Sequence, residues 1–254
     1  MALVTGASRG IGREVARQAV ARGARVGLVA RSAADLDEVL SLVGGRGVAI
    51  PADVADAAQV GDAVRQVEAA LGPVDVVVAN AGIGAFGPFA ETDPADIERL
   101  TRVNWLGTAY VVRAVLPGMV ERRRGHVAVV ASIAGRMGAP LEALYSATKF
   151  AQVGLAEALE VELAPHGIGV SVVHPGPVAT DFFAARGHPY DRRFPRPVSP
   201  ERVAAEVVDA VERGRAERFV PRWLRQALVS RVLVPPLYRW GARRAVPIPE
   251  RSAT

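Results

Sequence analysis

Lys149 is the only lysine among the 31 basic residues of this 254-residue sequence, and it follows Tyr145 by four places. On a helix, residues four apart lie on the same face, so the ammonium would lie beside the phenol. An exposed cation can usually be arginine as well as lysine, whereas a compact, strongly hydrated point charge is particular to lysine. The spacing therefore predicts a functional pair capable of acid–base chemistry.

A free tyrosine ionises near pH 10, so its phenolate is scarce at neutral pH unless a nearby positive charge favours it. Lowering the pKa by roughly three units takes about 4 kcal/mol, which one close cation together with a cofactor charge can supply. We therefore expect Lys149 to lower the pKa of Tyr145. The alternative is an ordinary surface lysine near a surface tyrosine, and Tyr-x-x-x-Lys alone does not decide between them.

Length and composition limit the class of protein. A chain of 254 residues can bury a full core as a single α/β domain. The absence of cysteine excludes disulfides, thiolate chemistry and cysteine-ligated metals, and it suits a reducing cytoplasm. The four histidines show no ligand spacing, so we expect no metal site.

The sequence also argues against export and against a membrane span. It opens without the basic and apolar regions of an export signal. The longest stretch free of formal charge, residues 163–180, contains three prolines and three glycines, which do not suit a membrane helix. We expect a cytoplasmic protein, with membrane association of its C-terminal tail left open.

The net charge of +5 is concentrated near the C-terminus. Residues 183–254 hold fifteen basic and seven acidic side chains, whereas residues 1–182 hold sixteen and nineteen. This asymmetry could favour an anionic membrane or an acidic partner, and the alternative is a solvated arginine-rich surface. No aromatic-interleaved basic strand or recognition helix accompanies the charge, so no nucleic-acid partner is expected.

Short β-branched runs alternate with alanine-rich stretches of helix length. The predicted strands are residues 3–5, 25–30, 48–50, 74–79, 126–131, 169–174 and 218–220. Nearly continuous apolar strands separated by helices indicate an α/β fold with a doubly wound parallel sheet, a Rossmann fold. In such a sheet ligands bind beyond the carboxyl ends of the strands.

Residues 1–222 are expected to form one catalytic domain, followed by an apolar, arginine-rich tail over residues 223–254. The Pro/Arg-rich stretch 187–200 lies between a helix-like segment, 178–186, and a predicted helix, 200–214. It suits the mobile part of a substrate loop over about residues 182–200 that covers a pocket, and it equally suits a plain surface connection.

A glycine-rich loop follows the first predicted strand directly and leads into a helix over residues 10–23. Glycine lets the backbone turn tightly beside a pyrophosphate, and the helix N-terminus offers it free N–H groups. A plain strand-to-helix turn is the alternative, but strand, loop and helix in this order favour a nucleotide. The residues predicted to hold it are Gly6, Ser8, Arg9, Gly10, Ile11 and Gly12.

The end of the second strand reads Ala30-Arg31-Ser32, where an NAD-binding protein usually places an acid for the adenosine ribose. Arg31, with Arg9, can instead form charge-assisted hydrogen bonds to a 2′-phosphate. We therefore predict NADP(H) as the cofactor. Asp53, with Val54 beside it, follows the third strand and is placed to accept a hydrogen bond from the adenine amino group.

Further motifs follow later strands in a fixed order. They are Asn80-Ala81-Gly82, Asn104, Ser132 thirteen places before Tyr145, Tyr145-x-x-x-Lys149 and Pro175-Gly176-x-x-x-Thr180. Together with the glycine loop they resemble the short-chain dehydrogenase/reductase family over residues 2 to about 182. The set is highly specific, since all of its members occur in order.

The resemblance implies a role for each residue. Tyr145 would be the general acid in reduction and the general base in oxidation. Ser132 would hydrogen-bond the substrate oxygen, and Lys149 would also hold the nicotinamide ribose. Asn104 would support a water-linked proton relay, and Thr180 would hold the nicotinamide carboxamide. Structural alternatives remain: Ser132 could cap a turn, Asn104 could bond backbone inside a helix, and Thr180 could cap a segment beginning at residue 181.

The tail departs from the family pattern, because residues 223–234 are apolar with arginines at intervals and are followed by Pro235-Pro236. Over residues 223–244 it could contact a membrane interface, cover a lipid-like substrate, or pack on its own domain or another subunit. The resemblance also implies a homodimer or homotetramer formed through the helices that carry Asn104 and Tyr145.

The function expected from these features is hydride transfer between NADP(H) and the carbonyl or secondary alcohol of a moderately apolar small molecule. The aromatic residues expected around its pocket are Phe86, Phe89, Phe182, Phe183 and Tyr190. The alternative is a non-catalytic NADP(H)-binding sensor or scaffold. A sensor needs only the glycine loop, so the presence of serine, tyrosine and lysine together favours the enzyme.

Overall fold

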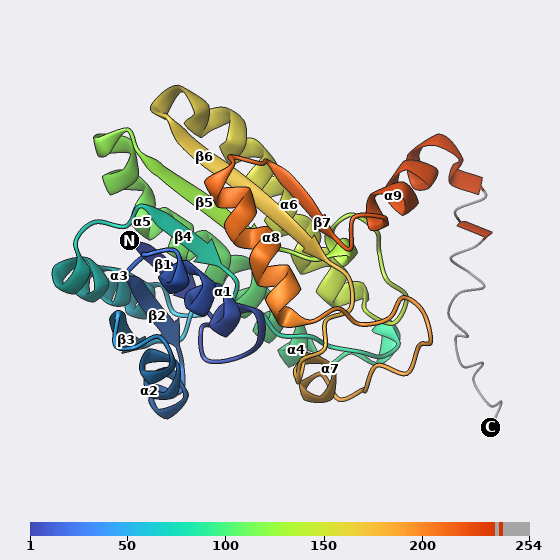
Figure 1. Ribbon diagram of the computed structural model, residues 1–254. Coiled ribbons are helices and arrows are strands. Elements are labelled where there is room, and N and C mark those ends of the chain that lie inside the picture. The colour runs from blue at the N-terminus through green and yellow to red at the C-terminus, as the bar shows by residue number, and fades with distance from the viewer. Residues whose placement is uncertain (237–238, 241–254) are drawn as a thin grey trace.

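A computed structural model describes residues 1–236 and 239–240, and within them seven strands form one parallel sheet (Figure 1). The strand order is β3-β2-β1-β4-β5-β6-β7, and all pairs are parallel. The strands are β1 Ala2–Thr5, β2 Val26–Ala30, β3 Gly47–Pro51, β4 Val76–Ala79, β5 Gly125–Val130, β6 Ile168–Pro175 and β7 Glu217–Val220. The predicted strands and the doubly wound fold are confirmed.

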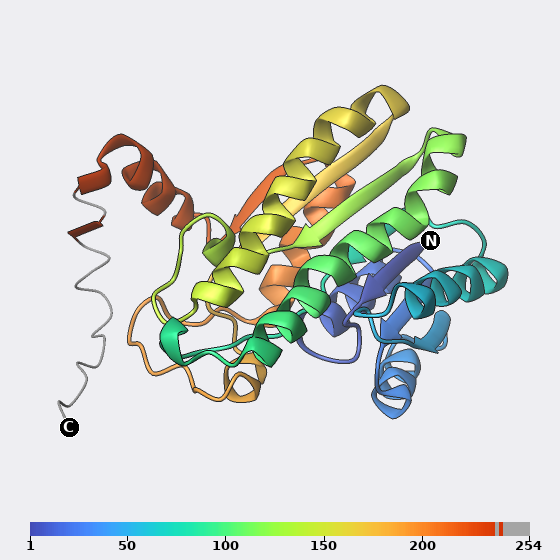
Figure 2. The same ribbon diagram turned by 180° about the vertical axis from the view of Figure 1, so that it is seen from behind.

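The sheet forms because its central strands are short runs of valine, leucine and alanine that are buried on both faces. Parallel sheets need such runs, since crossover helices cover each face. One face is covered by α1 Gly10–Ala21, α2 Ala33–Leu42 and α8 Pro200–Glu212, and the other by α3 Ala57–Leu71, α5 Gly107–Arg122 and α6 Ala143–Leu163 (Figures 1 and 2). Each layer has its own continuous apolar core.

Several helix starts are fixed by their sequence. Asp56 caps α3 through the N–H groups of Ala58 and Gln59, and Ser199 caps α8, in which Pro200 occupies the first turn. Such caps satisfy amides that have no partner within the helix. The shorter helices are η1 Phe89–Glu91, α4 Pro94–Leu100, the π-helical η2 Thr101–Leu106, η3 Ile133–Gly135, η4 Ala164–His166, α7 Phe182–Ala185 and α9 Leu224–Leu233.

The prediction of a helix over residues 178–186 is wrong for the first residues of that range. Val178 instead forms a parallel bridge with Val198, and the Ala179 N–H donates to the Val198 carbonyl at 2.8 Å. Because backbone pairing occupies these residues, the helix is reduced to α7, Phe182–Ala185. The bridge ties the segment before α7 to the end of the loop that leads into α8.

The direction of winding reverses at β1. From β1 the chain passes outward to β2 and β3, and β4 then returns to pair with the other edge of β1. The loops that follow β1 and β4 therefore leave the sheet side by side. This is the position at which doubly wound sheets open a crevice for a ligand.

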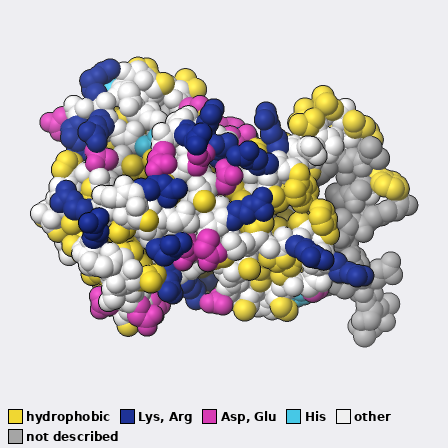
Figure 3. Space-filling model, viewed as in Figure 1, with side chains coloured by type: hydrophobic (Ala, Val, Ile, Leu, Met, Phe, Trp, Pro, Cys, Tyr) yellow, Lys and Arg dark blue, Asp and Glu magenta, His cyan; other side chains and the backbone are white. Residues whose placement is uncertain are grey.

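The tail begins with α9, which extends away from the sheet beyond the end of β7 (Figure 1). Leu224 is buried, whereas the side chains of Val232 and Leu233 are 69% and 73% exposed. Figure 3 shows hydrophobic side chains gathered over this helix. Among the described residues, no helix combines the length and the apolar character needed to cross a bilayer. The remainder of the tail, 237–238 and 241–254, falls outside the described residues.

Candidate active site

A cavity of about 1200 Å³ lies at the carboxyl ends of the strands. It brings together loops that follow β1, β2, β3, β4, β5 and β6 with the first turns of α6. The predicted residues among its lining are Gly6, Ser8, Arg9, Gly10, Ile11, Arg31, Asp53, Val54, Asn80, Ala81, Gly82, Ser132, Tyr145, Lys149, Pro175, Gly176 and Thr180. Segments far apart in sequence thus share one site, while Gly12 and Asn104 lie behind its wall.

The glycine loop is shaped by close backbone contacts. Gly6 has φ of +63°, and a Cβ there would lie 2.9 Å from the Cα of Ala81. At Gly12 a Cβ would lie 2.2 Å from the carbonyl oxygen of Gly6, which no side chain can accommodate. The first turn of α1 therefore packs directly on the loop.

The start of α1 suits an anion. No side chain caps this helix, and its first turn contains no acidic residue. The N–H groups of the turn are therefore left to a ligand, and the helix dipole favours a negative charge there. The glycine loop and the free N–H groups at the start of α1 together form a cradle, and this cradle fits the pyrophosphate of a dinucleotide.

Asn80 fixes the loop after β4 against the loop after β1. Its side-chain amide donates to the carbonyls of Thr5, at 3.0 Å, and Gly6, at 3.2 Å. The Thr5 hydroxyl in turn accepts from the backbone N–H groups of Asn80 and Ala81. These bonds cross the switch point of the sheet and hold both sides of the cradle in register.

The groups predicted for the adenosine end lie at the same cavity. Arg9 and Arg31 are both exposed and line it, so two guanidinium groups can reach a ligand phosphate there. Asp53 also lines it, with one carboxylate oxygen accepting from the Ala55 N–H at 2.9 Å. That bond orients the carboxylate and leaves its other oxygen for a ligand donor.

Tyr145 and Ser132 meet at the wall of the cavity. Ser132 lies close enough to Tyr145 to act on its pKa, and both residues are more than nine-tenths buried. Burial raises the pKa of Tyr145, and Ser132 opposes part of this rise as a hydrogen-bonding neighbour; Glu142 adds to it and Arg186 opposes it. Ser132 also caps η3 by accepting from the Ala134 N–H, so the capping alternative occurs, while its bond to a substrate oxygen stays a prediction.

Lys149 lies beside the tyrosine ring, with its Nζ 5.6 Å from the ring centroid. The ammonium donates to the carbonyl of Val130 at 3.1 Å and to Oε1 of Gln152 at 2.9 Å. Burial lowers the pKa of Lys149 to about 7. The protein's own groups do not lower the pKa of Tyr145, because desolvation of the phenol outweighs the charges around it. The expectation that Lys149 lowers this pKa is therefore wrong for the protein by itself.

Asn104 is fully buried in η2, a single π-helical turn. Its side-chain oxygen accepts from the Ile83 N–H, and its amide donates to the Ile83 carbonyl and the Thr148 hydroxyl. The structural alternative, bonding to backbone, therefore occurs, with Ile83 of the loop after β4 as the partner, and the relay role stays a prediction. The asparagine fixes the stretch after Gly82 against α6, because Ile83 and Thr148 come from opposite sides of the site.

Thr180 lies at the opposite side of the cavity, where the chain leaves β6 through Pro175 and Gly176. Its hydroxyl accepts a long hydrogen bond from the Phe182 N–H at 3.4 Å, but the N-cap of α7 is Asp181, so the capping alternative for Thr180 is wrong. Thr180 also lines the cavity.

The aromatic residues predicted around the pocket divide into two groups. Phe182 and Phe183 line the cavity, and the Phe182 ring packs 5.5 Å from that of Tyr145. Phe86, Phe89 and Tyr190 lie outside the lining. Their prediction as lining residues is wrong because they are placed elsewhere: Phe86 stacks on His188 of the loop after α7, Phe89 is 59% exposed, and Tyr190 donates to the Pro195 carbonyl within its own loop.

Three features of the site were missed in the sequence. Glu142 and Arg186 form an ion pair at 2.7 Å with side chains 15% and 4% exposed, and both act on the tyrosine. Gln152 contacts Lys149, and Leu224 of α9 lines the cavity. Only Gln152 had a usable sequence signal, since a residue three places after Lys149 lies on the same helix face.

Comparison with known proteins agrees with this geometry. A family model described as short chain dehydrogenase matches residues 1–191. The ketoacyl reductase HetN of Nostoc sp. is 33% identical over 94% of this chain and 88% of its own length. The 3-dehydrosphinganine reductase of Danio rerio is 37% identical over 86% of this chain and 70% of its own.

A solved structure extends the agreement to three dimensions. The 3-ketoacyl-(acyl-carrier-protein) reductase of Brucella melitensis, complexed with NADH, has a TM-score of 0.81 at 28% identity, and the match covers 86% of this chain and 95% of that one. Fold, site and relatives agree. This chain belongs to the short-chain dehydrogenase/reductase family of oxidoreductases.

Proposed function

We propose that this protein is an NADP(H)-dependent reductase of a ketone on an apolar chain. The observation that carries the proposal is the buried neighbouring pair of Ser132 and Tyr145, which lines the same cavity as the glycine cradle. The cofactor would supply the hydride. The glycine loop and the start of α1 would hold its pyrophosphate, and the protein would supply position and a proton.

Tyr145 would act as the general acid. Because burial raises its pKa, the phenol keeps its proton at neutral pH, which is the state needed to protonate a reduced carbonyl oxygen. Ser132 would hold the same oxygen through its hydroxyl and stabilise the charge that develops on it.

Lys149 and Thr180 would orient the nicotinamide end. With its pKa near 7, Lys149 is partly charged at neutral pH and can donate to ribose hydroxyls. The Thr180 hydroxyl would hold the carboxamide from the opposite side of the cavity. Two fixed contacts would determine which face of the ring meets the substrate.

The choice of NADP(H) rests on this chain's own arginines. Arg9 and Arg31 line the cavity at the end where a 2′-phosphate would lie, and a guanidinium fits a phosphate with paired hydrogen bonds. The structural relative from Brucella melitensis is complexed with NADH, so family membership alone does not determine the cofactor.

The substrate class follows from the lining and the relatives. Phe182, Phe183, Met137 and Leu224 supply apolar lining to the cavity, and the Phe182 ring packs against Tyr145. The relatives named above are a ketoacyl reductase and a 3-dehydrosphinganine reductase. A ketone carried on a long alkyl chain would bury its chain against these residues. A non-catalytic sensor would not require the buried Ser132–Tyr145 pair.

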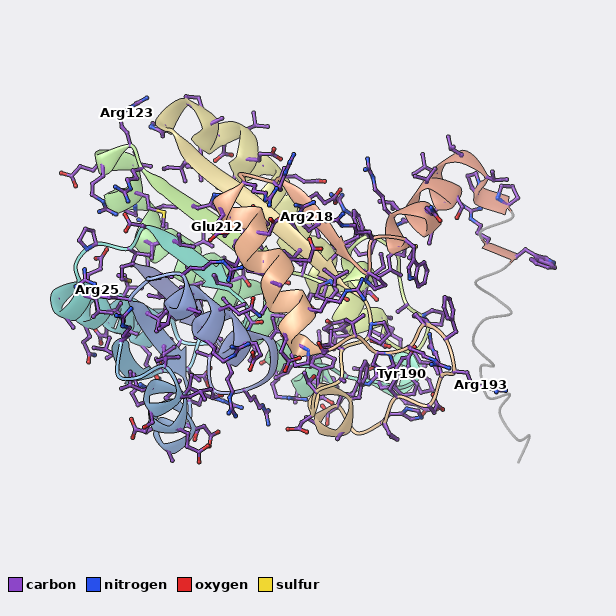
Figure 4. All side chains as sticks on the ribbon, in the orientation of Figure 1. Arg25, Arg123, Tyr190, Arg193, Glu212 and Arg218 are labelled. Atoms are coloured by element: carbon purple, nitrogen blue, oxygen red, sulfur yellow. The ribbon has the colours of Figure 1, made fainter. Side chains whose placement is uncertain are left out.

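The exposed tail supports a proposal about location, namely peripheral contact with an anionic membrane. Val229, Val232, Leu233 and Val234 of α9 and its end are between 46% and 73% exposed. From residue 218 to residue 249 the sequence has seven arginines and no acid. Arg193, on the loop between α7 and α8, lies on the same side of the molecule as α9 (Figure 4). Apolar side chains flanked by arginine fit an anionic lipid surface.

Replacing Tyr145 with phenylalanine removes the general acid and keeps the ring. We expect kcat/KM with NADPH and a long-chain 3-ketone to fall about 10²- to 10⁴-fold, since this is the usual contribution of general acid catalysis. Spectrophotometric NADPH oxidation measures it. The Tyr110→Phe variant, altered on α5 in the core, should keep its turnover. NADPH binding by the unmodified protein without turnover of any ketone in a broad panel would instead support the sensor.

Replacing Arg31 with aspartate should reverse the cofactor preference. Loss of charged hydrogen bonds, at about 1.5–3 kcal/mol each, predicts at least a tenfold fall in the ratio of kcat/KM for NADPH to that for NADH. Arg46→Asp, which changes the charge equally before β3, is the matched control. An unchanged ratio in the Arg31 variant would contradict the assignment of NADP(H).

We further propose a homodimer formed through α5 and α6, the helices next to the site. Phe150 and Val161 are the exposed large apolar side chains of α6, at 38% and 76%. Burial of such residues in a second copy would remove apolar surface from water. Light scattering at micromolar concentration should give twice the chain mass, falling toward one chain for Val161→Asp. A monomer throughout would exclude the dimer.

The membrane proposal predicts that the full-length protein sediments with vesicles of anionic phospholipid and does so weakly with neutral vesicles. The double variant Val232→Asp, Leu233→Asp should lose this binding, because it places charge on the apolar face of α9. Leu42→Asp, which alters an exposed leucine on α2, should bind as before. Unmodified protein that stays in the supernatant with both kinds of vesicle would refute it.

A further inference from the structure

Gln152 lies three residues after Lys149 on α6 and is completely buried. Its side-chain oxygen accepts from the Lys149 ammonium at 2.9 Å. Its amide group donates to the backbone carbonyl of Asn104 at 2.8 Å and to the Thr108 hydroxyl at 2.6 Å. One side chain therefore joins the lysine of α6 to the π-helical turn and to α5.

The network around Gln152 is closed. The Asn104 carbonyl accepts from Gln152 and also from the Thr108 hydroxyl at 2.9 Å, which uses both of its lone pairs. The side-chain amide of Asn104 uses its two hydrogens on Ile83 and Thr148. The π-helical turn that carries Asn104 is therefore a fixed anchor for the Gln152 amide group.

The amide of Gln152 does not titrate in water, so its bond to Lys149 positions the ammonium without exchanging a proton with it. The water-linked relay through Asn104 implied by the family resemblance stays a prediction.

We propose that Gln152 is a positioning residue, which holds the Lys149 ammonium between β5 and the π-helical turn. The proposal rests on the proposed function. Tyr145 gives its O–H proton to the oxygen of the reduced carbonyl, and the resulting phenolate regains a proton before the next cycle. No net charge remains on the protein after the cycle.

The charges near Lys149 are few. Tyr145 on α6 is the titratable group beside its ammonium, and burial is the cause of its lowered pKa. Glu142 and Arg186 act on the tyrosine from its other side, as an ion pair. From β5 the group that faces the ammonium is the neutral Val130 carbonyl. A change at residue 152 should therefore appear directly in the titration of Lys149.

The single lysine makes this measurable in the full chain. Protein labelled with [ε-¹³C]lysine gives one NMR signal for Lys149, and its shift against pH reports the pKa. For Gln152→Met, which fills the space and removes the acceptor, we expect the titration midpoint to fall by about one pH unit, because a hydrogen bond to the charged form is lost. For Gln152→Glu, an added negative charge should raise the midpoint.

Ser171→Ala is the matched control. Ser171 is fully buried in β6 and bonds His126 at 2.7 Å, so the variant loses a buried polar contact away from Lys149. It should lower the melting temperature and leave the lysine midpoint in place. If Gln152→Met does not fold, the glutamate variant still tests the sign of the change.

A midpoint that is the same in the unmodified protein and in a folded residue-152 variant would overturn the proposal. In the active enzyme, the high-pH limb of kcat/KM should move with the lysine midpoint, since the charged form is lost as pH rises. A midpoint that moves while this limb stays fixed would also overturn it, leaving Gln152 a packing role. Absence of any ketone reduction by the unmodified protein would instead count against the proposed function, since the NMR measurement needs no turnover.

Discussion

The site depends on the burial of an ammonium and a phenol side by side. Removing Lys149 from water disfavours its charged form, and removing Tyr145 disfavours its anion, so the pKa of the lysine falls and that of the tyrosine rises. An unpaired buried charge is costly, and the Val130 carbonyl and Gln152 provide the acceptors that reduce this cost. The desolvated pair can exist only where strand β5 and helix α6 hold these acceptors in place.

Several elements of the fold supply the acceptors that the buried ammonium requires. The end of β5 supplies Val130 and Ser132, α6 supplies the tyrosine, the lysine and Gln152, and the π-helical turn anchors that glutamine. A π-turn widens a helix locally and exposes a carbonyl that a regular α-helix would bond internally. Here that carbonyl, of Asn104, receives the Gln152 amide. The irregular turn is therefore part of the support for the site.

The glycine cradle depends on a different constraint. The backbone of the loop after β1 lies very close to the start of α1 and to the loop after β4. Gly12 leaves no space for a side chain against Gly6, and Asn80 ties both loops together. These contacts are short and polar, so they fix the cradle without adding apolar surface. The apolar surface of the site instead comes from α7 and α9, which join it from the C-terminal part of the chain.

The sequence by itself determined the order of strands and helices and the identity of most lining residues, because β-branched periodicity and the spacing of glycine, serine, tyrosine and lysine are local properties. It did not determine the direction of the tyrosine pKa, the closed bonds of Asn104, or the ion pair of Glu142 with Arg186. It also misplaced Phe86, whose partner His188 is about a hundred residues away. These features depend on burial and on contacts between distant segments, and only the packed tertiary structure fixes how much water and which charges surround a group.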